Sequence, residues 1–156
     1  MKITIACVGK ASRAQHDAAQ ALIDEYRTRL PWPVTIREVE DRKAGGGVVE
    51  RRAREAALLL TGLPKGAVIV ALDEKGKSLT SRQFADTLAG WRDGGEQEIA
   101  FLIGGADGLD KVVLSKARLT LSLSAMTWPH LLARVMLLEQ LYRAWSLQTG
   151  HPYHRD

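Results

Sequence analysis

Aromatic, imidazole and guanidinium side chains crowd the last residues of the chain, 151–156 (HPYHRD). A neutral imidazole accepts a proton near pH 7, so His154 is a candidate general base. Arg155 is suited to stabilise negative charge on a ligand, and Tyr153 to stack on or hydrogen-bond a nucleobase. The alternative is a frayed end without function. Two histidines three residues apart also raise the question of a metal, but no cysteine or dense carboxylate cluster stands nearby in sequence, so we expect no metal site.

A glycine loop at residues 104–108 (GGADG) follows a short apolar run. Closely spaced glycines let a backbone pass near a ligand and adopt positive φ angles. The spacing GGxxG differs from the GxGxxG fingerprint, and no GK[ST] follows, so NAD binding and a phosphate loop are both disfavoured. A plain tight turn between a strand and a helix is the alternative.

A second segment of small residues, 121–130 (LSLSAMTWPH), lies further along the chain. Its hydroxyl side chains at Ser122, Ser124 and Thr127 leave backbone amides and carbonyls accessible, and such groups can bind an adenine edge. Pro129 suits the start of a helix. The alternative is a loop in which Thr127 caps that helix and Trp128 belongs to the core.

Strands alternate with helices along the chain, which predicts one α/β domain with a parallel sheet and helices on both faces. Ligands in such sheets bind at the carboxyl ends of strands, where both small-residue segments fall. A glycine-rich loop at 41–47, expected to be mobile, and a charged loop at 73–77 connect elements, and Ser81 is a candidate helix cap. Strands are expected at 2–8, 34–39, 67–72, 98–103 and 119–123, and helices at 15–29, 48–60, 81–92, 111–117 and 130–148.

The helix expected at 130–148 is apolar on two sides. This pattern predicts that one side packs on the sheet and the other on a partner subunit, with a fully buried helix as the alternative. Glu139 and Arg143 are four residues apart and are expected to pair. Arg134 and Arg143 are available to meet phosphate if their face is open, and His130 is a further candidate for contact with RNA.

Composition gives only broad limits on the number of domains, the kind of partner and the cellular setting. The 156 residues suit one domain, and a net charge of +4 permits a polyanionic partner without requiring one. Cys7 is the one cysteine, so no intrachain disulfide is possible, and we expect a buried thiol in a reducing, cytoplasmic setting. No stretch is apolar enough to span a bilayer, and the N-terminus lacks the pattern of a signal peptide.

Four motifs in register resemble the ribosomal large subunit methyltransferase H family of bacterial SPOUT enzymes. They are LIGGADG, SLSAMTWPH, ARVMLLEQLYRAWS and HPYHR, and together they cover about the last third of the chain. The segment 70–77 (VALDEKGK) is also similar to the family. A non-catalytic ribosome- or RNA-binding α/β protein is the first alternative, and a nucleotide-binding oxidoreductase or hydrolase is the second.

The resemblance implies a trefoil-knotted fold, a homodimer and S-adenosylmethionine as methyl donor, without a metal. It implies transfer to N3 of a pseudouridine in 23S rRNA, within the large subunit or the assembled ribosome. Tyr153, His154 and Arg155 are then the candidate catalytic residues, and His130 and Arg143 the candidates for substrate RNA. The motifs place cofactor contacts on Leu72, Gly105, Ser124, Ala125, Met126, Thr127, Trp128 and Pro129. Trp128 differs from the smaller or other apolar residues expected at this position. Two alternatives therefore stay open for its contact with the cofactor: the ring, or the backbone alone.

Overall fold

A five-stranded parallel sheet organises the computed structural model, which describes residues 1–9, 13–43 and 45–155, with the backbone alone for 13–17. The strands are β1 (Lys2–Val8), β2 (Val34–Val39), β3 (Val68–Ser78), β4 (Glu98–Ile103) and β5 (Leu119–Ser122), in the order β2-β1-β4-β3-β5. The helices are α1 (Arg13–Arg29), α2 (Val48–Leu60), α3 (Ser81–Asp93), α4 (Lys111–Lys116) and α5 (His130–Thr149). The predicted α/β class is confirmed.

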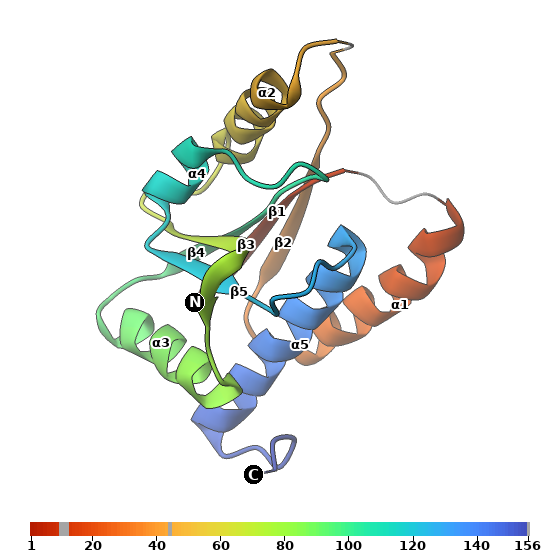
Figure 1. Cartoon of the computed structure of the whole chain (residues 1–156). Helices are drawn as coiled ribbons and strands as arrows, with labels where there is room; N and C mark the ends of the chain where they lie inside the picture. The colour runs from red at the N-terminus through yellow and green to blue at the C-terminus, as the bar shows by residue number, and fades with distance from the viewer. Residues whose placement is uncertain (10–12, 44, 156) are drawn as a thin grey trace.

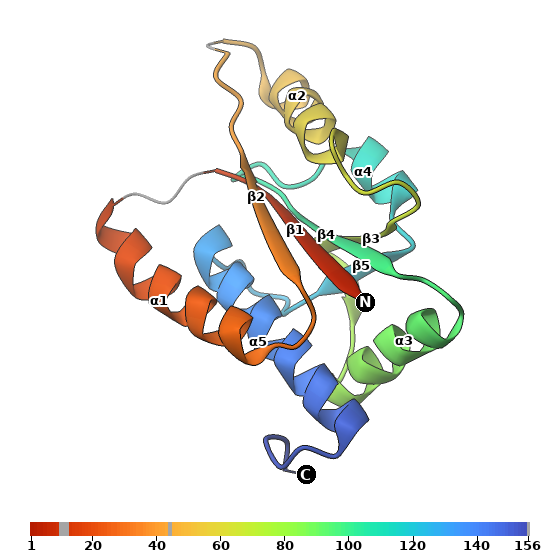
Figure 2. The ribbon, with the colours of Figure 1, turned by 180° about the vertical axis from the view of Figure 1, so that it is seen from behind.

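Helices cover both faces of the sheet (Figures 1 and 2). Helices α1, α3 and α5 enclose the larger apolar cluster, in which Ile5, Phe101 and Leu137 are buried. Helices α2 and α4 cover the other face through a smaller cluster around Leu59 and Val113. Burial of these side chains is the main source of stability for the fold.

Cys7 lies near the carboxyl end of β1 and is fully buried, as expected. Its thiol donates a weak hydrogen bond to the carbonyl oxygen of Arg37 at 3.4 Å. Burial raises the pKa of the Cys7 thiol to about 11, which keeps it protonated and unreactive near neutral pH.

The expectation of a charged loop at 73–77 is wrong, because β3 continues to Ser78. After an irregularity between Leu72 and Lys77, β3 pairs with β5 again at Lys77 and Ser78. Gly76 makes this possible, since a Cβ there would lie 2.7 Å from the carbonyl oxygen of Thr120. Main-chain pairing with β5 therefore prevails over the polar composition of the segment.

Local signals account for most helix ends. Helix α3 is capped by Thr80, not by Ser81, because Thr80 and Gln83 form a capping box. The Ser81 hydroxyl donates to Gln140 of α5 instead, at 2.7 Å. Pro129 is the N-cap of α5, and Gly150 ends that helix with a φ of 69°. The other element bounds differ from the predictions by no more than two residues.

The segment 41–47 has neither helix nor strand at its described residues, and Gly45 and Gly46 both have positive φ angles. Ala44 lies outside the described residues, and the mobility of this loop stays a prediction. Across the described parts of the chain, no helix combines the length and apolar character needed to cross a membrane. The trefoil knot and the homodimer also stay predictions.

Candidate functional site

A cleft with a volume of about 860 Å³ lies at the carboxyl ends of β4 and β5, next to the middle of β3. Its walls come from residues 72–75 within β3, from 103–109 at and after the end of β4, and from β5 and the segment that leads to α5. Arg52 of α2 also lines it. The volume is in the range of pockets for small molecules and cofactors. Parallel strands bring their carboxyl ends to one edge of the sheet, which explains why segments distant in sequence meet here.

Most of the candidate cofactor residues surround this cleft. The candidates that line it are Leu72, Gly105, Ser124, Met126, Thr127, Trp128 and Pro129. Ala125 belongs to the same loop but does not line the cavity. His130, a candidate for contact with RNA, also lines it.

The glycine loop folds back on itself, which turns its backbone toward the cleft. The amide of Gly108 donates to the carbonyl oxygen of Gly105 at 3.0 Å, and Gly108 has a φ of 78°. A Cβ on Gly104 would lie 2.9 Å from the carbonyl carbon of Gly108. The loop therefore depends on the absence of side chains. Arg51 of α2 holds the loop through an ion pair with Asp107 at 2.9 Å.

Hydroxyl groups shape the loop at 124–129. The Ser124 hydroxyl accepts a hydrogen bond from the amide of Met126 at 3.0 Å. Thr127 donates to a carboxylate oxygen of Glu74, also at 3.0 Å, so this loop is tied to β3. Thr127 therefore caps no helix, and Trp128 is 40% exposed and does not belong to the core. Met126 and Trp128 offer apolar surface to a flat ring at the cleft.

The expectation that Arg134 is available to phosphate is wrong. Its side chain is 2% exposed and forms an ion pair with Glu38 of β2. It also donates to the carbonyl oxygen of Gly9 at 3.0 Å and lies 3.2 Å from Nδ1 of His130. Burial, and then the charge of Arg134, lower the pKa of His130. Nothing in the local sequence identified Glu38 as the partner.

The tail is folded onto the second half of α5. The Tyr153 hydroxyl donates to Glu139 at 3.1 Å, and its ring packs edge to face on Tyr142, with 4.7 Å between centroids. Arg143 pairs with Glu139, as expected, and its guanidinium lies 4.9 Å from the centre of the Tyr153 ring. Arg143 also donates to Nδ1 of His154 at 3.1 Å. The tail is therefore packed, and the candidate residues Arg143, Tyr153 and His154 lie together.

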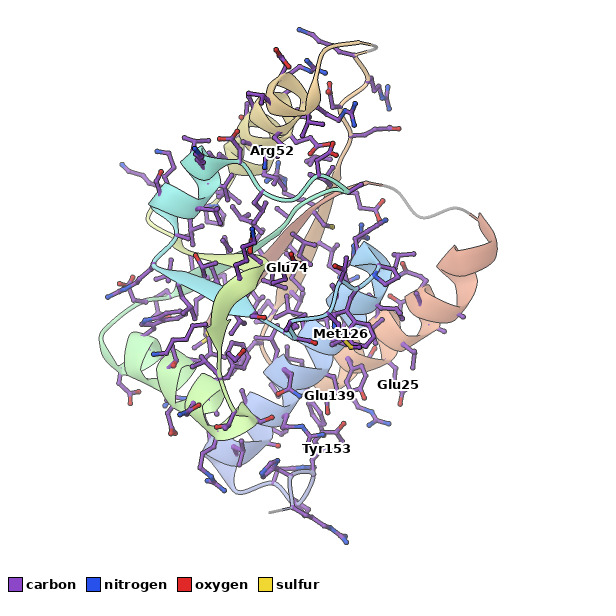
Figure 3. All side chains as sticks on the ribbon, viewed as in Figure 1. Glu25, Arg52, Glu74, Met126, Glu139 and Tyr153 are labelled. Carbon is purple, nitrogen blue, oxygen red and sulfur yellow. The ribbon has the colours of Figure 1, made fainter. Side chains whose placement is uncertain are left out.

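The tail and the cleft do not meet within this chain. Tyr153, His154 and Arg155 are absent from the walls of the cleft. Figure 3 shows Tyr153 and Glu139 below Glu74 and Met126, which line the cleft. Glu139 follows His130 by nine positions along α5, which amounts to about 14 Å at 1.5 Å per residue. The two groups of candidate residues are therefore separate in one subunit.

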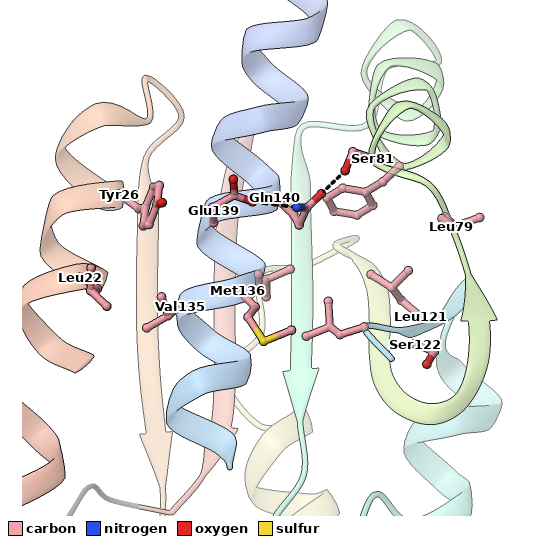
Figure 4. A pocket seen from close by; sticks show the side chains of 13 residues that line it. Leu22, Tyr26, Leu79, Ser81, Leu121, Ser122, Val135, Met136, Glu139 and Gln140 are labelled. Carbon is pink, nitrogen blue, oxygen red and sulfur yellow. Dashed lines mark hydrogen bonds between the residues drawn. The ribbon is translucent and has the colours of Figure 1, made fainter. Parts of the chain in front are cut away.

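A groove with a volume of about 490 Å³ runs over α5 between α1 and α3 (Figure 4). Leu22 and Tyr26 of α1 face Val135, Met136 and Glu139 of α5 across it. Two further residues, Leu121 and Leu123, line both the groove and the cleft. The groove leaves this apolar side of α5 open in the single chain, whereas the opposite side packs on the sheet, and contact with a partner subunit stays a prediction.

The arrangement suits a nucleotide-like ligand held by backbone groups, next to one histidine. Among the side chains of residues 1–9, 18–43 and 45–155, no three His, Cys, Asp or Glu residues gather to hold a metal ion. Sequence reasoning missed Glu38 and Tyr26, whose roles depend on contacts with residues far along the chain.

Known proteins are similar to this chain over its whole length. A family model described as "Predicted SPOUT methyltransferase" matches residues 1–154. A protein of Dinoroseobacter shibae named ribosomal RNA large subunit methyltransferase H is 52% identical, over 99% of each chain. A protein of the same name from Rhodospirillum centenum is 51% identical, again over 99% of each. A solved structure, a probable methylase family protein from Haemophilus influenzae, shares the fold with a TM-score of 0.60 at 10% identity, over 99% of this chain and 70% of that one.

Proposed function

This chain belongs to the SPOUT methyltransferase family, with relatives named ribosomal RNA large subunit methyltransferase H, and we propose that it methylates N3 of a pseudouridine in 23S rRNA. S-adenosylmethionine is the proposed methyl donor. The observation that carries the proposal is the cleft, where the glycine loop and the loop at 124–129 meet at the carboxyl ends of the strands.

The cleft fits the proposed cofactor in size and in the chemistry of its walls. Backbone groups at Gly105 and Ser124 suit the polar edge of an adenine, and Met126 and Trp128 suit its faces. Leu72 supplies apolar surface at the base of the cleft. When bound, S-adenosylmethionine supplies a methyl group already activated by its sulfonium, so the protein has mainly to align the reactants.

The nitrogen that receives the methyl group must also lose a proton. N3 of a uracil-like ring carries a proton, which must leave as the new carbon–nitrogen bond forms, and negative charge then develops on the ring carbonyl oxygens. We assign stabilisation of that charge to Arg155, contact with the base to Tyr153, and proton acceptance to His154. In the observed tail Nδ1 of His154 faces Arg143, so acceptance at that nitrogen requires the tail to leave this position.

We further propose a homodimer in which the tail of one subunit serves the cleft of the other. Two observations support it: the tail does not line its own cleft, and the groove next to that cleft is open. Arg143 orients the tail and His130 meets the RNA in this arrangement. The proposed enzyme is one knotted SPOUT domain that works in the cytoplasm, where ribosomes are available.

Deletion of residues 153–156 tests the tail. We expect calorimetry to show unchanged binding of S-adenosylmethionine and the methylation of ribosomes to be lost. Full activity of the truncated protein would exclude the tail mechanism. Mass spectrometry of 23S rRNA, with free rRNA, large subunits and whole ribosomes as substrates, identifies the nucleotide and the form that is recognised.

Calorimetry also decides between the proposed enzyme and the alternatives. A non-catalytic RNA-binding protein would take up no S-adenosylmethionine. A nucleotide-dependent oxidoreductase or hydrolase would bind NAD or ATP in a parallel titration.

A further inference from the structure

We propose that Arg134 holds His130 as a neutral imidazole with its hydrogen on Nε2, so that His130 serves methyl transfer as a hydrogen-bond donor and not as a base. The inference rests on the proposed function and adds a role within the same cleft. It begins with the 3.2 Å contact between the Arg134 guanidinium and Nδ1 of His130. A guanidinium donates and never accepts, so Nδ1 must be the acceptor and the hydrogen of a neutral ring lies on Nε2.

Both terminal nitrogens of Arg134 are held by hydrogen bonds. It is 2% exposed, one terminal nitrogen binds Glu38, and the other also reaches the carbonyl oxygen of Gly9 at 3.0 Å. A guanidinium keeps its charge at all ordinary pH values. The donor that faces Nδ1 is therefore permanent, and the tautomer of His130 follows from it.

The same contact opposes protonation of His130. An imidazolium would direct a second N–H at the guanidinium, and like charges at this distance repel. Among the side chains of residues 1–9, 18–43 and 45–155, the charged groups that act on the ring are Arg134 of α5 and Glu38 of β2, while Cys7 of β1 interacts with both and is protonated. Burial first, and Arg134 second, lower the pKa of His130, while Glu38 opposes the shift.

The other side of the ring is directed away from Arg134, toward the end of β1. A Cβ on Gly9, which has a φ of 97°, would lie 3.4 Å from Nε2 of His130. His130 also lines the cleft, and the proposal assigns its Nε2 hydrogen to the edge where the proposed cofactor and nucleobase meet. As N3 loses its proton, the electron pair spreads to the ring carbonyl oxygens. A donor at Nε2 stabilises that charge without taking the proton, which leaves to the tail or to water.

Replacement of His130 separates a donor from a base. In His130→Gln the side-chain amide can donate near the position of Nε2 but cannot accept a proton at neutral pH. We expect kcat/KM of His130→Gln to stay within about tenfold of wild type, and that of His130→Leu to fall by about 100- to 1,000-fold. Equal loss in both variants would mean a base, and equal retention would mean no role; either result overturns the proposal.

Two controls accompany these variants. Thermal unfolding and calorimetric binding of S-adenosylmethionine show whether each variant folds and keeps its cofactor site. An inactive wild-type protein would reject the proposed function itself, which differs from an active wild type whose Gln and Leu variants behave alike. Nitrogen NMR of the His130 ring in the wild-type protein reads the tautomer directly. Signals of an Nδ1–H or doubly protonated ring at pH 7 would contradict the proposal.

A paired substitution tests Arg134 as a positioning residue. Arg134→Met with Glu38→Met removes both charges of the pair, so neither is left buried alone. We expect nitrogen NMR of the His130 ring in this double variant to show the hydrogen shared between Nδ1 and Nε2 at pH 7, because no guanidinium then faces Nδ1, whereas the wild type keeps it on Nε2. A purely structural role of Arg134 would lower stability and leave the tautomer unchanged, which would overturn the assignment. In a His130→Gln background the same pair should lower kcat/KM less than it does in the wild-type background, and an equal loss would also overturn the assignment.

Discussion

The cleft at the start of α5 and the tail packed on its second half are built from different parts of the chain. The cleft uses backbone groups and small side chains, and its glycine loop has no space for a Cβ on Gly104. The tail uses large side chains, with Tyr153 held by Glu139, Tyr142 and Arg143. Added atoms should therefore damage the cleft, whereas removed functional groups should damage the tail.

The largest expected effect concerns whether cleft and tail act in one subunit or across two. A Gly104→Val variant with an intact tail and a variant without residues 153–156 should each lose most activity. A co-expressed heterodimer of the two retains one intact cleft facing one intact tail, so we expect about half of the wild-type activity per dimer. Affinity tags on each subunit allow its purification. No recovery in the heterodimer would place cleft and tail in the same subunit.

Gly76→Ala should weaken the pairing that ties the end of β3 to β5. The new Cβ would lie 2.7 Å from a backbone oxygen and 2.8 Å from backbone carbons of β5, which cannot move aside as a side chain would. We expect the free energy of unfolding in urea to fall by about 1–3 kcal/mol, the usual range for overpacking. The cleft should weaken with it, since Glu74 of the same segment holds Thr127. Unchanged stability would contradict the close approach at Gly76.

Gly104→Ala should weaken cofactor binding with less effect on stability. The methyl group would lie 2.9 Å from the backbone of Gly108, so the loop must shift. We expect the calorimetric Kd for S-adenosylmethionine to rise by about tenfold, equivalent to about 1.4 kcal/mol. Gly90→Ala in α3 is the matched control, because nothing lies within 4 Å of its Cβ. That change should leave Kd unaltered and stabilise the helix by about 0.5–1 kcal/mol.

Tyr153→Phe should give the smallest effect on stability. We expect the free energy of unfolding to fall by about 0.5–1.5 kcal/mol, because the hydrogen bond of the hydroxyl is missing. Burial, and then the contacts with Tyr26 and Glu139, raise the pKa of Tyr153 above its ordinary value of 10.0. The native protein therefore keeps a proton that the unfolded chain loses above about pH 10, so stability falls as pH rises through that range. The difference in free energy of unfolding between the wild type and Tyr153→Phe should be largest below pH 10 and should shrink above it. Denaturant unfolding at several pH values measures it, with Tyr26→Phe as the control that keeps the Glu139 bond.

Local pattern predicted most of the fold but failed where a partner distant in sequence decided the outcome. Apolar runs identified β1 and β4, because strands buried on both faces need apolar residues throughout. The polar segment at 73–77 was misassigned, since the sequence carries no sign that β5 pairs with it. Within the candidate site, small residues marked both loops that line the cleft, and their role in cofactor binding stays a prediction. Arg134 was misassigned because a cation four residues after His130 on a helix is usually exposed, and its burial depends on Glu38.

The sequence by itself determined the alternation of strands and helices, the two small-residue loops and the Glu139–Arg143 pair, because each depends on residues close together in the chain. The tertiary structure alone decided that Arg134 is buried against Glu38, 96 residues away, and that Tyr153 lies against Tyr26, 127 residues away. It also decided that the tail and the cleft are apart in one subunit. Such contacts depend on how the helices pack on the sheet, which no local pattern of residues records.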